Sequence, residues 1–243
     1  MIAGCLGEFF GTMVLVILGD GVVATALLNK SKGYQAGWMA ITTGWFVAVV
    51  IGVFVAQSLG SPNADINPAI SFSKFCLHQY SFAQTCIFML SQLSGAFLGA
   101  IGVWLAYLPH WGVTPDVDHK LMVFCTKPAI RAYPYNFLCE MIATAILIIG
   151  VAAIFGKATP NGSLAPGIGP YLVGVLVWGI GLSLGGPTGY AINPARDLGP
   201  RLAHALLPIA GKGSSEWSYA WVPVFGPFLG GIIAAFLWSF MTS

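Results

Sequence analysis

Two tripeptides decide the fold of this 243-residue chain: Asn67-Pro68-Ala69 and Asn193-Pro194-Ala195. Asparagine is a favoured N-cap and proline is favoured at the first position of a helix, so each tripeptide predicts a helix start. The apolar segments that begin there, 67–77 and 193–206, would rise roughly 16–21 Å as helices, about half the thickness of a membrane. We therefore expect two half-helices in re-entrant loops.

The composition of the chain is that of a membrane protein. Only 7% of the residues are charged and 57% are hydrophobic, whereas an ordinary soluble domain is about 25% charged. A water-soluble enzyme, a coiled coil and a basic nucleic-acid-binding arm are excluded, because each needs charge that is missing. The formal net charge of +2 indicates no anionic partner. The five cysteines show no metal-ligand spacing, so we expect neither a metal nor a cofactor.

Six apolar runs are long enough to cross roughly 30 Å of hydrocarbon, which takes about 20 residues. Because lipid cannot satisfy backbone polar groups, and the runs are too long for barrel strands, we expect helices. The predicted spans are 3–28, 36–58, 83–107, 136–155, 166–184 and 219–240. The segment 108–135 is predicted to be a long connecting loop.

The chain also repeats itself. Glu8 recurs as Glu140, and the first Asn-Pro-Ala tripeptide recurs as the second, in the same order. We predict one transmembrane domain, 1–243, made of two repeats at approximately 1–107 and 136–243, each with three spans and one half-helix. An odd number of spans inverts the second repeat, which aims both half-helix N-termini at the bilayer midplane.

These features resemble the aquaporin, or major intrinsic protein, family over essentially the whole chain. The resemblance is carried by the two Asn-Pro-Ala motifs at equivalent positions, the Glu at the start of each half and the Asn-Pro-Ala-Arg-Asp run at 193–197. It implies an all-α integral membrane protein with six transmembrane helices, two re-entrant half-helices and an inverted internal repeat, in a right-handed bundle around a central pore. It also implies a homotetramer in the cell membrane, with both termini in the cytoplasm.

The two half-helix N-termini predict the chemistry of the pore. Each carries roughly half a positive elementary charge from aligned peptide dipoles, and two that face each other repel cations and hydronium but not neutral molecules. The Asn67 and Asn193 amides can also donate hydrogen bonds to a passing oxygen, which would interrupt a proton-conducting chain of waters. The alternative is that both asparagines only cap helices, and the two roles are compatible.

Arg196 predicts the position of the constriction. An arginine at mid-membrane depth costs at least about 2.5–3.5 kcal/mol unless it faces water, so we expect it to line the pore. In the family this arginine and three further residues form the narrowest point, and the resemblance places these at Thr43, Gly181 and Tyr190. Gly181 would widen the wall, and Tyr190 would offer an aromatic face to the carbon backbone of a polyol. Thr43 departs from the Trp or Phe usual in glycerol facilitators, and Trp45 lies two positions further on.

Three residues resemble markers of the glycerol facilitator, or aquaglyceroporin, branch: Asp197, Arg201 and Pro223. Asp65 is a departure, because the family normally has His two residues before the first motif, and the loop before it is a few residues longer. Asp65 could pair with Lys74, attract cations, titrate as a gate at the pore mouth, or be a solvated loop charge.

Glu8 and Glu140 need partners, because a lone carboxylate inside a membrane helix is expensive. The resemblance implies that each accepts hydrogen bonds from the loop that leads into a half-helix. The alternative role is a proton relay. Their equivalent placement in the two halves favours loop support.

We therefore expect a passive channel for water and small uncharged polyols such as glycerol that excludes ions and protons. The alternatives are a water-selective aquaporin and a secondary transporter of small neutral solutes. The run Gly181-Leu182-Ser183-Leu184-Gly185 spells G-x-S-x-G but lacks the strand–turn–helix context of a nucleophile, so we expect no catalytic residue and no enzyme. Asp116, Asp118 and His119 are interpreted as solvated loop charges and not as metal ligands.

Charge alone points to the opposite orientation. With the N-terminus inside, the inner loops hold only Lys74 and Lys157, while the other loops hold most of the lysines and arginines. The positive-inside rule favours the reverse topology, although it is weak for long and re-entrant segments. We follow the resemblance and expect cytoplasmic termini.

Overall fold

The structure is a computed structural model that describes residues 2–156, 164–165 and 167–242, and within these ranges every regular element is a helix. The six long helices are α1 (Ile2–Leu27), α2 (Gly37–Ser58), α4 (Phe82–Ala106), α7 (Tyr133–Phe155), α8 (Ile168–Leu184) and α10 (Trp221–Thr242). Five of them are long and apolar enough to cross a membrane, and α8 is an apolar helix of 17 residues, the lower end of the spanning range. The predicted all-α integral membrane fold is confirmed. Lys157 and residue 166, the predicted start of the fifth span, lie outside the described residues.

The two half-helices begin at the predicted residues. They are α3 (Pro68–Cys76) and α9 (Pro194–Leu206), each with proline in its first turn. The Asn67 side chain accepts a hydrogen bond from the Ala69 amide at 2.9 Å. The Asn193 side chain accepts one from the Ala195 amide at 3.0 Å. Each asparagine thus satisfies a backbone donor that the start of a helix leaves unpaired.

The segment 108–135 is not the plain loop that the sequence predicted. It contains two short helices, α5 (Leu108–Trp111) and α6 (Val117–Phe124). Asp116 caps α6, because its side chain accepts hydrogen bonds from the backbone amides of Asp118 and His119 at 2.8 and 3.1 Å. The Asp118 side chain forms an ion pair with Lys127. The Phe124 ring lies 5.4 Å from the His204 ring in an edge contact, so α6 covers one side of α9.

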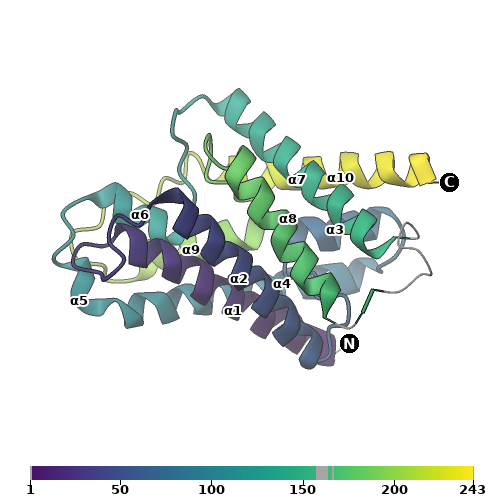
Figure 1. The fold of residues 1–243 in the computed structure, drawn as a ribbon, viewed down its shortest axis with the longest axis horizontal. Coiled ribbons are helices and arrows are strands. Elements are labelled where there is room, and N and C mark those ends of the chain that lie inside the picture. Colours follow the sequence, from purple (N-terminus) through teal and green to yellow (C-terminus); the bar gives the residue numbers. More distant parts are fainter. Residues whose placement is uncertain (1, 157–163, 166, 243) are drawn as a thin grey trace.

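The helices pack so that each half-helix rests on a span from the other half. α1 packs against α2 and α4, α7 packs against α8 and α10, and the α2–α8 contact joins these groups. α9 lies against α4, and α3 lies against α10. In Figure 1 the N- and C-termini lie toward the right-hand end of the molecule, and α5 and α6 lie at the opposite end.

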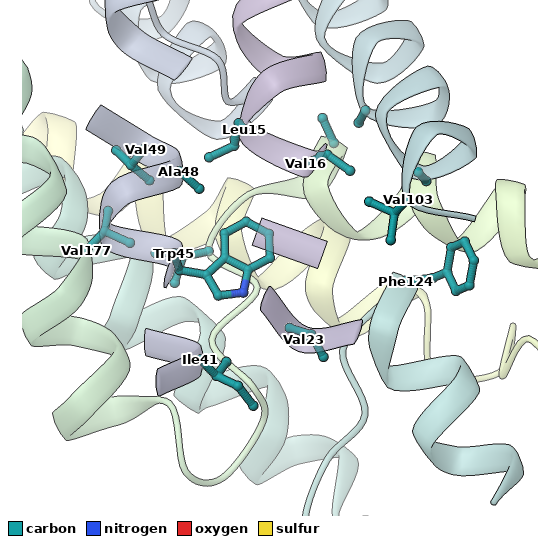
Figure 2. Close-up of a cluster of buried hydrophobic side chains, with 14 of the residues drawn as sticks. Leu15, Val16, Val23, Ile41, Trp45, Ala48, Val49, Val103, Phe124 and Val177 are labelled. Carbon is teal, nitrogen blue, oxygen red and sulfur yellow. The ribbon is translucent and has the colours of Figure 1, made fainter. Parts of the chain in front are cut away.

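Glycines allow the closest helix contacts in both halves. A Cβ added at Gly95 of α4 would lie 2.1 Å from the Phe9 carbonyl oxygen of α1, and one at Gly230 of α10 would lie 2.1 Å from the Met141 carbonyl oxygen of α7. Small residues permit this backbone approach between membrane helices. Buried Val, Leu and Ile side chains form a core around the indole of Trp45 (Figure 2).

Candidate functional site

The tips of the two half-helices touch at the centre of the molecule. The Asn67 Nδ2 donates to the Ile192 carbonyl oxygen at 2.8 Å, and the Asn193 Nδ2 donates to the Ile66 carbonyl oxygen, also at 2.8 Å. Each amide group carries two N–H donors, so one bond to the opposite loop leaves the second donor of each asparagine for another acceptor. Both asparagines line the same cavity.

The loops leading into the half-helices have the same strained backbone. Ala64 and Ile66 before α3 have φ of 42° and 43°, and Tyr190 and Ile192 before α9 have φ of 39° and 44°. A left-handed conformation costs a non-glycine residue roughly 1–3 kcal/mol and persists only where the surroundings enforce it. The repeated geometry therefore requires a support in each half.

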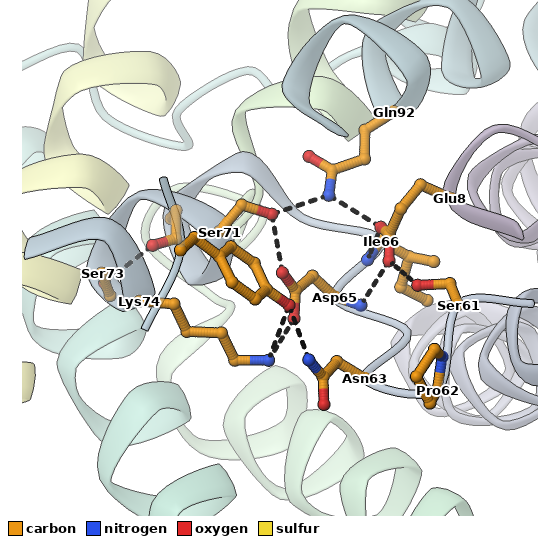
Figure 3. Close-up of polar contacts among 12 residues, drawn as sticks. Glu8, Ser61, Pro62, Asn63, Asp65, Ile66, Ser71, Ser73, Lys74 and Gln92 are labelled. Atoms are coloured by element: carbon orange, nitrogen blue, oxygen red, sulfur yellow. Dashed lines mark hydrogen bonds and ion pairs between the residues drawn. The ribbon is translucent and has the colours of Figure 1, made fainter. Parts of the chain in front are cut away.

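Glu8 and Glu140 are in contact with these loops, and both are fully buried. The Glu8 carboxylate accepts hydrogen bonds from the backbone amides of Asp65 and Ile66 at 2.9 and 2.7 Å. Glu140 accepts them from the amides of Ala191 and Ile192, at 3.0 and 2.9 Å. Glu8 is also bound by the Ser61 hydroxyl at 2.6 Å and the Gln92 amide at 2.8 Å (Figure 3).

A cavity of about 480 Å³ passes the half-helix tips. Polar groups on its wall include Asn67, Asn193, Arg196, Asp65 and Lys74. Apolar side chains cover much of the rest of its wall; they include Leu15, Val49, Val53, Ile70, Leu147, Val173 and Val177. The passage is therefore amphipathic, with a line of hydrogen-bonding groups beside an apolar surface.

Arg196 lies against an aromatic side chain and lines the cavity together with a second one. Its guanidinium carbon lies 4.2 Å from the centroid of the Trp45 ring. Tyr190 lines the cavity with it and makes an edge contact of 5.7 Å with Trp38, whose indole nitrogen donates to the Gly181 carbonyl at 3.0 Å. Gly181 lies behind Tyr190, since an added Cβ there would be 2.8 Å from the phenol ring. Gly181 thus provides room for the ring.

Thr43 is not placed beside Arg196 and Tyr190. It is absent from the cavity wall, and its hydroxyl donates to the Met39 carbonyl of its own helix at 2.7 Å. Trp45 lines the cavity instead. Two positions on a helix lie about 200° apart around its axis, so only one of these residues can face the pathway. The assignment of Thr43 is corrected to Trp45, and the longer loop before the first motif explains the error of two positions.

Asp65 is neither free nor solvated, so its interpretation as a solvated loop charge was wrong. It is 2% exposed, pairs with the Lys74 ammonium and accepts a hydrogen bond from the Ser71 hydroxyl at 2.8 Å. The Tyr80 hydroxyl accepts from Asn63 at 2.9 Å and from Lys74 at 3.4 Å. Figure 3 shows these groups and the Glu8 contacts as one polar network. The pairing with Lys74 is the one alternative that this geometry supports.

Asp197 and Arg201 form a fully buried ion pair on α9, 2.8 Å apart. Asp197 accepts hydrogen bonds from the Thr126 amide and hydroxyl, both at 2.7 Å, and Arg201 donates to the carbonyls of Thr126 and Ser215 at 3.0 and 2.8 Å. The pair joins α9 to the segments on either side of it. Pro223 is buried in the first turn of α10 and does not line the cavity.

A lysine caps the C-terminal end of α9. The Lys212 ammonium donates to the carbonyls of His204, Ala205 and Leu207 at 2.7, 2.8 and 2.6 Å, and burial lowers the pKa of this group. A cation there neutralises the negative end of the helix dipole and satisfies carbonyls that the helix leaves unpaired.

Several site residues were not predicted from the sequence: Trp38, Ser61, Ser71 and Gln92. Gln92 carried a usable signal, because a polar side chain within an apolar span needs a partner or a function. The aromatic and hydroxyl residues carried none, since their roles depend on contacts across the fold.

The chain is similar to one protein family over almost its whole length. The sequence profile described as major intrinsic protein matches residues 1–238. A probable glycerol uptake facilitator protein of Thermotoga maritima is 54% identical over 236 residues, which is 97% of this chain and 98% of the relative. Glycerol uptake facilitator protein 3 of Lactiplantibacillus plantarum is 50% identical over 96% of this chain and 95% of the relative. The X-ray structure of the aquaglyceroporin from Plasmodium falciparum superposes with a TM-score of 0.84 at 27% identity, over 98% of this chain and 95% of that one.

Proposed function

The chain belongs to the major intrinsic protein family, and on that premise we propose that it is a glycerol facilitator. In this proposal it is a passive transmembrane channel, and not an enzyme, that conducts glycerol, other small uncharged polyols and water along their gradients. Ions and protons are excluded. The names of its relatives support glycerol as the solute.

The observation that carries this proposal is that Arg196, Trp45 and Tyr190 line the cavity together, and there we place its constriction. Glycerol has hydroxyls on one edge and C–H groups on the other. Arg196 offers fixed donors in a fork, while the rings of Trp45 and Tyr190 offer an apolar face. A polyol can keep its hydroxyls hydrogen-bonded while its carbons contact the rings, so the loss of its hydration is compensated.

Exclusion of protons and cations rests on the half-helix tips. α3 and α9 direct their positive ends to the point where Asn67 and Asn193 meet, and each asparagine keeps one amide hydrogen for a solute oxygen. A water that accepts both bonds directs its own hydrogens away from the tips. A hydrogen-bonded proton path is therefore interrupted, and a cation meets two positive helix ends.

We further propose a homotetramer in the cell membrane, with both termini in the cytoplasm. The two chain ends lie toward one end of the molecule in Figure 1, as an even number of spans requires. A reporter domain that is active only in the cytoplasm should be active when it is fused to either terminus. Cross-linking in the membrane should stop at four copies.

The decisive experiment uses proteoliposomes in stopped-flow light scattering. We expect glycerol permeability well above that of empty vesicles, and a pH-sensitive dye inside should report no added proton leak. Water flux without glycerol flux would favour the water-selective alternative. Loss of glycerol uptake on collapse of an ion gradient would favour a secondary transporter.

Matched variants test the constriction itself. Trp45→Ala should widen it and admit larger polyols, whereas Thr43→Ala, the control on the same helix, should leave the solute range unchanged. Arg196→Ala should admit cations. Gly181→His should cut glycerol flow more than water flow, because the new side chain displaces Tyr190 into the pathway; equal losses would contradict the placement of Gly181 behind that ring.

A further inference from the structure

The cavity wall carries a second group of hydrogen-bonding side chains on the α3 side of the half-helix tips. Among the described residues that line the cavity, the charged ones are Arg196 on α9, Lys74 on α3 and Asp65 in the loop before α3. Lys74 comes seven residues after Asn67, so it lies roughly 10 Å along the helix from the tip. In Figure 1 α9 lies nearer α5 and α6, whereas α3 lies nearer the chain termini. A solute that passes the tips therefore meets Arg196 on one side of them and Lys74 on the other.

One face of α3 has the same amphipathic character as the constriction. Asn67, Ile70, Lys74 and Leu77 line the cavity, and their spacing of three or four residues places them along one side of the helix and its caps. Lys74 thus lies between two apolar side chains on the pathway wall, with Ile70 toward the tip and Leu77 beyond it. This face offers N–H donors beside an apolar surface.

Lys74 is held in place by its neighbours. Its ammonium forms an ion pair with Asp65, lies 5.3 Å from the centroid of the Tyr80 ring and donates to the Tyr80 hydroxyl at 3.4 Å. The Asn63 amide donates to the same hydroxyl at 2.9 Å, so the lysine and asparagine side chains converge (Figure 3). An ammonium has three N–H donors, and the described residues provide two acceptors. One N–H therefore remains for a solute, which can reach it because the Lys74 side chain is 22% exposed.

Asp65 connects this lysine to the loop that presents Asn67. The Asp65 side chain is fully buried, its carboxylate accepts a hydrogen bond from the Ser71 hydroxyl at 2.8 Å, and its backbone amide donates to Glu8 at 2.9 Å. The Asp65 charge also offsets the Lys74 charge, so the pair has no net charge. An ion would lose its hydration there without a net opposite charge to replace it. A neutral polyol therefore fits the site better than an ion does.

We propose that Lys74 is a second specificity-determining residue of the pathway, which binds a hydroxyl of an uncharged polyol on the α3 side of the tips. Its ammonium, fixed by Asp65, donates to that hydroxyl while Ile70 and Leu77 contact the carbon backbone. The polyol thus has a charged hydrogen-bond donor on both sides of the half-helix tips. The choice of a polyol as the solute rests on the proposed function; the exposed donor and its support do not.

Stopped-flow measurements on proteoliposomes test this role with three variants. Lys74→Met removes the donors, so glycerol permeability should fall about threefold to tenfold, the factor that one ordinary hydrogen bond supplies. Water permeability should not change, because the tips and the constriction stay intact. Lys74→Arg keeps a cation with donors and should restore most of the glycerol permeability. The control Lys127→Met removes a lysine of the same 22% exposure from an ion pair that is not on the cavity wall, and should alter neither permeability.

Purified protein gives a second readout that needs no transport. Saturation-transfer NMR on glycerol should show about half the signal in Lys74→Met, since one of two sites with charged donors is lost, and the full signal in Lys127→Met. Equal falls in the glycerol and water permeabilities of Lys74→Met would indicate a distorted loop and overturn the proposal, as would an unaltered glycerol permeability. A wild-type protein that conducts no glycerol, but whose NMR signal depends on Lys74, would overturn only the proposed function.

Discussion

The loops before α3 and α9 have the same backbone conformation, but the ion pair near each loop lies at a different position. In both, a buried glutamate binds two consecutive amides and two residues have left-handed φ. Before α3 the pair is Asp65–Lys74, whose lysine side chain is 22% exposed and lines the cavity. On α9 the pair is Asp197–Arg201, with both side chains fully buried.

This comparison separates the features that both halves need from the features that are particular to one half. The glutamate and the strained loop recur because each half must present an asparagine at the same point. The ion pairs do not occupy equivalent positions, and their surroundings differ. The Asp65–Lys74 pair lines the cavity and its lysine is partly exposed, whereas Asp197–Arg201 binds Thr126 and Ser215 and fixes the segments that cover α9. Changes to the two pairs should therefore have unequal effects.

The largest expected effect is that of Arg201→Met. It leaves the Asp197 carboxylate buried without its cation, a loss of about 3–5 kcal/mol. The matched change Lys74→Met should cost less, because the Lys74 side chain is 22% exposed and Asp65 keeps its hydrogen bond from the Ser71 hydroxyl. Denaturant unfolding in mixed micelles measures both values. Equal losses would show that the two pairs are energetically alike.

The next effect tests the shared part of the loops. Glu8→Gln and Glu140→Gln each replace an oxygen acceptor with an amide that opposes a backbone donor, so each should lose about 1.5–3 kcal/mol per charged hydrogen bond removed. Glycerol permeability should fall in both variants, since both asparagines depend on these loops. A silent substitution at either glutamate would break the equivalence of the two halves.

The smallest effect concerns backbone strain. At Ile66 and at Ile192, glycine should give a more stable protein than alanine by about 1–2 kcal/mol, because only glycine adopts a left-handed conformation without a Cβ clash. Ile148 in the middle of α7 is the control, and there alanine should be the better replacement by about 1 kcal/mol. Apparent melting temperatures rank each pair. If glycine and alanine variants ranked in the same order of stability at all three positions, the strain at Ile66 and Ile192 would be contradicted.

Local signals in the sequence predicted the starts of both half-helices to the residue, because an Asn cap followed by Pro acts within one turn. The long spans followed from the length of the apolar runs, which is also a local property of the sequence. Trp45 was missed because extra residues in a loop shifted the register, which no periodicity within α2 reveals. The burial of Asp65 depended on the side chains that α3 folds back toward it, which the sequence pattern does not place. The Asp116 cap of α6 is a local signal like the asparagine caps, but the short helix that follows it is too weakly apolar to stand out in a long polar segment.

The crossed bonds between Asn67 and Ile192 have a consequence for biosynthesis. The carbonyl that holds Asn67 lies 125 residues further along the chain, so at about 5–20 residues per second the ribosome delivers it roughly 6–25 s later. During that interval the first re-entrant segment sits in the bilayer with its tip unheld. The two half-helix tips can therefore meet only when both halves have been translated.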